Sequence, residues 1–291
     1  MINNNRFRLY LEMFKLKIVL PVSLTGFTGF FLIDPSFSAK SFLVTTGIIF
    51  MAIAASVINQ LQEIETDKKM ERTMSRPLPS GKISVVSAWL VAIIFLIAGS
   101  IIIRYNGNNA AMIVSLFTVF WYNGVYTVLK RVTSLAVIPG ALTGAMPPLI
   151  GWLAAGGDPF DPRITIIQLF FFTGQIPHFW LLLLKYGDQY KKADFPVLTA
   201  FLSYHSVKRL IFITLLISVL SAILMSIGGI IINNMMISLI IVLSAGLMIV
   251  FYIFLKENND QKKISRYSAI LNSYYLVIMF LLISDRVIAS I

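Results

Sequence analysis

The sequence predicts an all-α, polytopic membrane protein with about nine transmembrane helices around a central cavity, and three observations support this. Of the 291 residues, 57% are apolar and 13% are charged, whereas the surface of a soluble globular protein needs roughly 25% charged residues. The apolar residues form long uncharged runs, and most basic residues lie in alternate gaps between those runs. A chain of this kind must be solvated by lipid.

Runs free of Asp, Glu, Lys and Arg define the expected spans, because a bilayer-spanning helix needs roughly 20 apolar residues. The run 210–255 is long enough for two spans, with Gly228, Gly229, Asn233 and Asn234 as the turn between them. The first run is short. The runs are 18–33, 41–62, 83–103, 105–129, 132–157, 164–184, 210–255 and 267–284. We expect a single membrane domain over 1–291, with no separate soluble domain.

The distribution of charge orients these spans, because cytoplasmic loops accumulate Lys and Arg. With nine spans, 20 of the 24 basic residues and 9 of the 13 acidic residues fall on the side of the N-terminus. The whole net charge of +11 then lies on that face, which we expect to be cytoplasmic. Such a face would attract anionic lipid headgroups or a phosphorylated substrate. Nucleic acid is not an expected partner, because insertion topology already explains the basicity.

Two further features narrow the function. The chain has no cysteine, which excludes disulfides, thiolate metal sites and covalent c-type haem attachment. The N-terminal segment from Arg6 to Lys17 is too charged for a cleavable signal peptide, so we expect the first span to stay as a membrane helix.

The first of two longer cytoplasmic segments, 63–82, begins with a cluster of polar side chains. Asn59, Glu63 and Asp67 are spaced i, i+4 and i+8, which keeps all three on one side of a helix. Carboxylates four residues apart repel each other. A cation between them would remove the conflict, and oxygen ligands suit Mg²⁺. The alternative is a helix end with structural salt bridges, such as one between Glu65 and Lys69.

Two arginines follow on the same segment. Arg72 and Arg76 are four residues apart and precede a rigid turn over 77–81. Guanidinium groups beside carboxylates make a good diphosphate site, because Mg²⁺ and Arg neutralise the same anion from two sides. Their alternative role is to set the membrane topology.

Another polar group lies within an apolar run. His178 precedes Lys185 in the sixth span, and an ionisable residue inside a span suggests function. The alternative is an interhelical hydrogen bond to a neighbouring backbone.

The fifth span contains helix-distorting residues. Gly140 and Gly144 form a G-x-x-x-G pair, typical of close helix packing. We expect Pro147 and Pro148 to break the span and free backbone carbonyls, which must then face a protein-lined cavity.

The polar cluster also carries a resemblance to a known family. The runs 59–67 and 71–81 resemble the first signature of the UbiA prenyltransferase superfamily, and 72–79 is similar to its protohaem IX farnesyltransferase branch. Further matches lie at 126–133, 140–152 and 175–180. The resemblance runs from about Tyr10 through the ninth helix in the same order.

This resemblance implies an enzyme that transfers a farnesyl group from farnesyl diphosphate to a vinyl group of haem b, adding water to give haem O. It implies a bacterial cytoplasmic (inner) membrane protein with a cytoplasmic active face. Mg²⁺ would be the cofactor, and haem b, farnesyl diphosphate and membrane lipid would be bound. A haem-delivery or oxidase-assembly protein would be a partner.

The resemblance also assigns roles to residues. Glu63 stands where the superfamily usually has Asp, which keeps the carboxylate and lengthens its reach. The second cytoplasmic segment, 185–209, supplies Asp188 as the preferred second acid, with Gln189 and Asp194 left open. The implied metal ligands are Asn59, Glu63, Asp67 and Asp188. The implied catalytic residues are these four with Arg72, Arg76 and Lys130. The implied substrate-binding residues are Tyr122, Tyr126, Arg131, His178, Trp180, Tyr190 and Lys191, with His178 as an iron ligand or a polar contact of haem.

The chemistry expected is ionisation of the allylic diphosphate, with the carbocation held against aromatic faces. Tyr122, Tyr126, Phe179 and Trp180 are the candidates for those faces. Two other functions stay open: prenylation of a quinone or chlorophyll precursor, and membrane transport. A transporter would place its ionisable residues near the bilayer midplane, whereas here they lie at helix ends.

Overall fold

The computed structural model describes residues 4–257 and 260–289, and within those ranges the chain contains only helices and loops. Eight helices are long and apolar enough to cross a membrane, or nine if a bent pair at the N-terminus is one span. The prediction of an all-α polytopic membrane protein is therefore confirmed, while the side that the N-terminus faces stays a prediction. The long helices are α2 (Leu16–Phe31), α3 (Ala39–Gln62), α5 (Val85–Asn106), α6 (Asn109–Phe120), α8 (Val137–Ala154), α9 (Pro162–Lys192), α10 (Tyr204–Ile227), α11 (Asn234–Lys256) and α12 (Gln261–Ala289).

Short elements connect the long helices and cluster near the charged segments. They are α1 (Asn4–Met13), α4 (Ile64–Lys68), the π-helical η1 (Trp121–Tyr126), α7 (Thr127–Leu129) and the 3₁₀ turns η2 (Ser134–Ala136) and η3 (Leu198–Ala200). The π-helical turn continues α6 into α7, so these three form one span.

The predicted turn within 210–255 is present. Helix α10 ends at Ile227 and α11 begins at Asn234. Gly229 takes a left-handed conformation with φ 67°, which glycine adopts without a steric cost. The Asn233 side chain accepts hydrogen bonds from the backbone of Met235 and Met236 and caps α11.

The first span is bent. Helices α1 and α2 meet at an angle of 50°. Lys15 lies at the junction with φ 52° and ψ 47°, a left-handed conformation that costs a residue other than glycine about 1–2 kcal/mol.

The second cytoplasmic segment, expected from 185, begins inside a helix, because α9 continues to Lys192. At 31 residues, α9 is about 46 Å long, which exceeds the roughly 30 Å hydrocarbon core of a bilayer. Its last turns are held by the first charged segment, where the Arg72 guanidinium contacts the Tyr190 hydroxyl at 3.5 Å.

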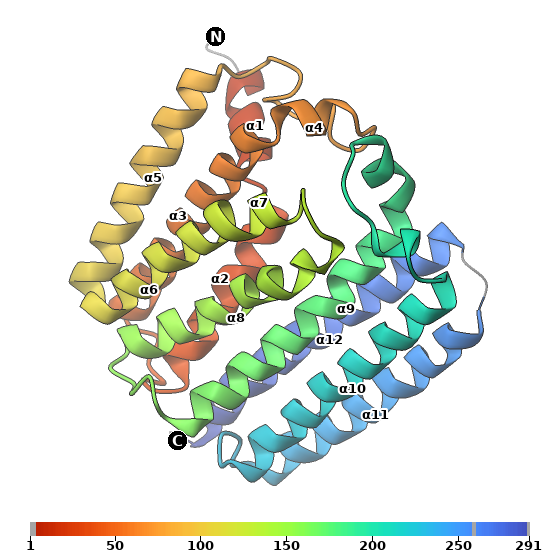
Figure 1. Cartoon of the computed structure of the whole chain (residues 1–291). Helices are drawn as coiled ribbons and strands as arrows, with labels where there is room; N and C mark the ends of the chain where they lie inside the picture. The colour runs from red at the N-terminus through yellow and green to blue at the C-terminus, as the bar shows by residue number, and fades with distance from the viewer. Residues whose placement is uncertain (1–3, 258–259, 290–291) are drawn as a thin grey trace.

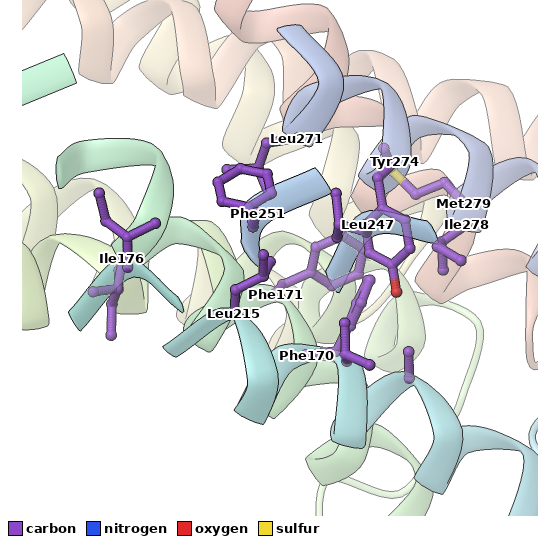
Figure 2. Close-up of a cluster of buried hydrophobic side chains, with 14 of the residues drawn as sticks. Phe170, Phe171, Ile176, Leu215, Leu247, Phe251, Leu271, Tyr274, Ile278 and Met279 are labelled. Carbon is purple, nitrogen blue, oxygen red and sulfur yellow. The ribbon is translucent and has the colours of Figure 1, made fainter. Parts of the chain in front are cut away.

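The long helices form two groups, seen at the upper left and the lower right of Figure 1. The N-terminal group contains α2, α3, α5, α6 and α8, and the C-terminal group contains α9 to α12. Helix α8 packs on α9, and α2 contacts α12, so the groups meet along two seams. The C-terminal group holds the largest apolar core, with Phe170, Phe171, Leu247, Phe251 and Tyr274 in close array (Figure 2).

The predicted break in the fifth span is absent, because α8 runs through Pro147 and Pro148 without interruption. Proline has no N–H, so the carbonyls one turn earlier, on Thr143 and Gly144, lose their helical donors. Both of these residues line a cavity instead. Helix α2 packs closely against these turns, since a Cβ on Gly29 would lie 2.0 Å from the Pro148 carbonyl oxygen.

Candidate active site

Two adjoining cavities lie inside the N-terminal group and along its seam with α9. The polar cavity, of about 270 Å³, contains most of the charged side chains predicted for the site. The apolar cavity, of about 280 Å³, is lined mainly by aliphatic and aromatic residues of α2, α3, α6, α8 and α9. Six residues line both: Lys15, Ile18, Tyr122, Tyr126, Phe179 and Leu182.

The first acidic cluster reaches the polar cavity as the spacing predicted. Asn59, Glu63 and Asp67 all line it, with exposed fractions of 2%, 7% and 1%. Helix α3 ends at Gln62, but α4 restarts at Ile64, so the shared face continues across Glu63. The Asn59 amide donates to the Thr127 hydroxyl at 3.1 Å, which fixes its carbonyl oxygen on the other side.

Basic side chains neutralise the two carboxylates. Arg76 Nη1 lies 2.9 Å from Asp67 Oδ2, and Lys130 forms an ion pair with Glu63. The alternative pairing of Glu65 with Lys69 is wrong, because Glu65 pairs with Lys68 across one turn. These exposed residues lie outside the polar cavity.

The polar cavity is cationic overall. Two carboxylates line it, and four basic residues line it with them: Lys15, Arg72, Arg76 and Lys130. Arg72, Arg76 and Lys130 alone outnumber the two carboxylates, and this surplus of positive charge favours an anionic ligand.

Aromatic residues lie at the boundary between the two cavities. Tyr122 and Tyr126 stack with ring centroids 5.5 Å apart, and Tyr126 lies 5.9 Å from Phe179. Lys130 Nζ lies 5.3 Å from the centre of the Tyr126 ring. Both tyrosines belong to the π-helical turn, a feature that often occurs at functional sites.

Trp180 lines the polar cavity and offers a free donor. Its Nε1–H is buried and has no hydrogen-bond partner in the described structure. A buried donor without a partner is costly, and an acceptor atom of a bound ligand would satisfy it.

His178 lines the apolar cavity rather than the polar one. Its Nδ1 lies 3.1 Å from the Asn272 side-chain oxygen on α12. When the neutral ring carries its proton on Nδ1, it donates to that oxygen and Nε2 keeps a lone pair. His178 therefore makes an interhelical hydrogen bond, but to a side chain rather than to the backbone considered as an alternative, and the second ring nitrogen stays available.

Some predicted site residues are not brought to either cavity. Tyr190 lines the polar cavity, but its neighbours Asp188 and Lys191 on α9 are exposed and line neither cavity. Arg131 is also exposed, and it donates to the carbonyl of Gln62 at the end of α3. Asp194 pairs with Lys69 at 2.5 Å.

Sequence reasoning did not assign Lys15 to the site. Lys15 lines both cavities and contacts Asn59 Oδ1 at 3.5 Å, although its position suggested only a topology charge. Gln189, left open above beside Asp188, lines neither cavity, and its side chain accepts from the backbone N–H of Arg72 at 3.2 Å. No sequence signal marks these contacts, because each joins segments far apart along the chain.

The donor set suits a magnesium diphosphate. Mg²⁺ is usually held by one or two carboxylates together with substrate phosphate oxygens. Within the described ranges, no three acidic, histidine or cysteine side chains form a metal cage. Glu63, Asp67 and the Asn59 carbonyl oxygen would hold Mg²⁺ against the phosphates, while the cations and the free Trp180 donor would bind the anion.

Comparison with known families agrees with this geometry. Residues 20–281 match the UbiA prenyltransferase family. A protoheme IX farnesyltransferase of Geobacter sulfurreducens is 35% identical over 65% of this chain and 70% of its own length. A protoheme IX farnesyltransferase of Nitratidesulfovibrio vulgaris is 35% identical over 67% of this chain and 68% of its own.

Solved structures share the fold. A digeranylgeranylglyceryl phosphate synthase structure superimposes with a TM-score of 0.77 at 20% identity, covering 97% of this chain and 98% of the other. A UbiA homologue of Archaeoglobus fulgidus bound to DMAPP and Mg²⁺ gives a TM-score of 0.69 at 19% identity, covering 93% of this chain and 98% of the other. At these identities the structural likeness concerns the fold.

Proposed function

Because the chain belongs to the UbiA prenyltransferase family, we propose that it transfers a farnesyl group from farnesyl diphosphate to a vinyl group of haem b and so forms haem O. The observation that carries this proposal is the joining of a cationic polar cavity to an apolar one. An allylic diphosphate has the same two parts, a charged head and an apolar chain.

The polar cavity accounts for the diphosphate half of the reaction. Arg72, Arg76 and Lys130 take up the charge that develops on the leaving diphosphate, since all three line the cavity. Bound Mg²⁺ would supply further charge neutralisation of the phosphate oxygens. Asp67 orients Arg76 and Glu63 orients Lys130 through their ion pairs, and the two acids would provide the carboxylates of the metal site.

The bond changes balance without a further reagent. The C1–O bond of farnesyl diphosphate breaks, and both electrons stay with the diphosphate. The vinyl π electrons form the new carbon–carbon bond, water supplies a hydroxyl group to the other vinyl carbon, and the released diphosphate accepts the proton. Tyr122, Tyr126 and Phe179 surround the boundary where the allylic cation forms, and their faces stabilise positive charge.

His178 favours haem b as the acceptor. Its ring lines the apolar cavity and its Nδ1 is paired with Asn272. A neutral imidazole held in this way is a common ligand of iron. The names of the curated relatives support the same acceptor.

The residues that line neither cavity receive different roles. Asp188, Lys191 and Arg131 lie at the charged end near the polar cavity, where they would attract the diphosphate and its metal before they enter. We place that end at the cytoplasmic face of a bacterial inner membrane, which agrees with the distribution of basic residues. A haem-delivery or oxidase-assembly protein would be a partner that docks on this farnesyltransferase.

The test uses the full chain in detergent with isotopically labelled farnesyl diphosphate, Mg²⁺ and either haem b or hydroxybenzoate. We expect the mass of haem O to appear, labelled, in the first reaction alone. Labelled hydroxybenzoate without labelled haem would contradict the proposed acceptor and favour a quinone precursor. Binding of farnesyl diphosphate without any transfer would contradict the enzymatic function.

A further inference from the structure

Lys15 occupies a position that no other basic residue in the described structure shares. Of the six residues that line both cavities, it alone is basic. Arg72, Arg76 and Lys130 line only the polar cavity. The side chain of Lys15 therefore lies at the boundary between the polar and the apolar cavity.

The boundary is where the reacting bond must lie, on the function proposed above. The diphosphate occupies the polar cavity and the prenyl chain occupies the apolar one. The C1–O bond that joins them then crosses the boundary, among Lys15, Tyr122, Tyr126 and Phe179.

Lys15 is also free to bind an anion. Arg76 and Lys130 are already paired with Asp67 and Glu63, but no described carboxylate forms an ion pair with Lys15. Its hydrogen-bonding contact in the described structure is with Asn59 Oδ1 at 3.5 Å. An ammonium group has three donors, so two stay available for a ligand.

The backbone at Lys15 supports a specific placement. The residue holds a left-handed conformation at the junction of α1 and α2. Such a conformation in a residue other than glycine persists where the surrounding structure holds it, and it is common at functional sites. Lys15 thus lies at the 50° bend between the two helices and lines both cavities.

We propose that Lys15 is a further catalytic residue, whose ammonium group binds the oxygen that joins prenyl carbon C1 to the diphosphate. When the C1–O bond breaks, both electrons stay on that oxygen. Lys15 stabilises the charge by a hydrogen bond and keeps its proton, while the diphosphate leaves as the anion.

The experiment measures ionisation without the acceptor. Farnesyl diphosphate with ¹⁸O at the bridging position is incubated with the full chain and Mg²⁺, and recovered substrate is analysed for label in non-bridging positions. Reversible breaking of the C1–O bond moves the label. We expect Lys15→Gln to slow this exchange about 10²-fold, the effect of removing one donor to a developing oxyanion, and Lys15→Arg to recover part of the rate.

A neighbouring lysine provides the matched control. Lys17 lies on the same segment, is exposed and lines neither cavity, so Lys17→Gln should exchange at the wild-type rate. Lys15→Asn controls for misfolding, because Asn accepts the left-handed conformation. Its exchange rate should fall as much as that of Lys15→Gln. Thermal unfolding in detergent confirms that each variant is folded.

The outcomes separate this inference from the proposed function. A loss in Lys15→Gln and Lys15→Asn of less than about 10-fold, or an equal loss in Lys17→Gln, overturns the role of Lys15. Wild-type exchange together with failure to prenylate haem b would refute only the acceptor. Equilibrium binding of farnesyl diphosphate, measured alongside, should weaken less than the exchange rate falls, and the reverse result would reduce Lys15 to a binding group.

Discussion

The two helix groups differ in how regular they are. The C-terminal group, α9 to α12, surrounds an apolar core in which the tyrosine hydroxyls have partners: Ser244 with Tyr274 and Ser218 with Tyr275. The N-terminal group contains the left-handed Lys15, the π-helical turn and the two adjacent prolines of α8, whereas the C-terminal group has a single proline within a helix, Pro177 of α9. Both cavities lie mainly against the irregular group. Departures from ideal helix geometry are therefore concentrated where a ligand must fit.

The largest effect on activity should come from Asp67, the acid in the polar cavity of the N-terminal group. Asp67→Asn keeps the shape of the side chain but removes the charge that pairs with Arg76 and would bind Mg²⁺. We expect turnover to fall at least about 10³-fold in a protein that still folds. Mass measurement of the prenylated product gives the turnover.

Glu65→Gln is the matched control for Asp67→Asn. Glu65 lies two residues away on α4, is exposed and pairs only with Lys68 among the described residues. Turnover in Asp67→Asn close to that of Glu65→Gln would remove the metal assignment.

The close contact of α2 and α8 predicts a large effect on stability. In Gly29→Ala the new Cβ would lie 2.0 Å from the Pro148 carbonyl oxygen, so the two helices must separate. We expect a loss of about 3 kcal/mol or more in the free energy of unfolding, at the upper end of the usual cost of overpacking. Denaturant unfolding in mixed micelles measures this.

The regular group supplies the control glycine. At Gly246 of α11, no described atom lies within 4 Å of the position that an added Cβ would take, so Gly246→Ala should keep wild-type stability or gain up to about 1 kcal/mol. Equal losses at Gly29 and Gly246 would contradict the difference between the two groups.

An intermediate effect is expected where the groups meet. His178→Ala should raise the concentration of haem b needed for half-maximal turnover by about 10- to 100-fold. Farnesyl diphosphate should bind almost unchanged, because His178 lines the apolar cavity alone. Titration of each substrate separately provides the measurement. Equal weakening of both substrates would count against a role in haem binding.

The smallest effect should come from the exposed end of α9. Asp188 lines neither cavity, so Asp188→Asn should lower turnover less than about 10-fold, as a charge acting only at long range would. The effect should shrink further at high salt, because exposed charges are screened. A loss as large as that of Asp67→Asn would mean that α9 rotates when the diphosphate binds.

Much of this arrangement could be predicted from the sequence, because its signals are local. Uncharged runs predict spans, and the spacing of Asn59, Glu63 and Asp67 predicts their common face. Lys15 could not be identified, because its role depends on a bend and on a residue 44 positions away. The prolines of α8 misled for the same reason: glycines of α2, far earlier in the chain, support the helix at that point.

The π-helical turn at Trp121–Tyr126 determines in which direction around the helix axis the later side chains of the same span point. An α-helix advances about 100° per residue, so the extra residue accommodated by a π turn displaces the later side chains around the axis by a comparable angle. Lys130, four residues beyond the turn, forms its ion pair with Glu63 from this displaced position. Removing a single residue from the turn would keep the length of the span nearly unchanged. The Lys130 side chain would nevertheless point to a different neighbour.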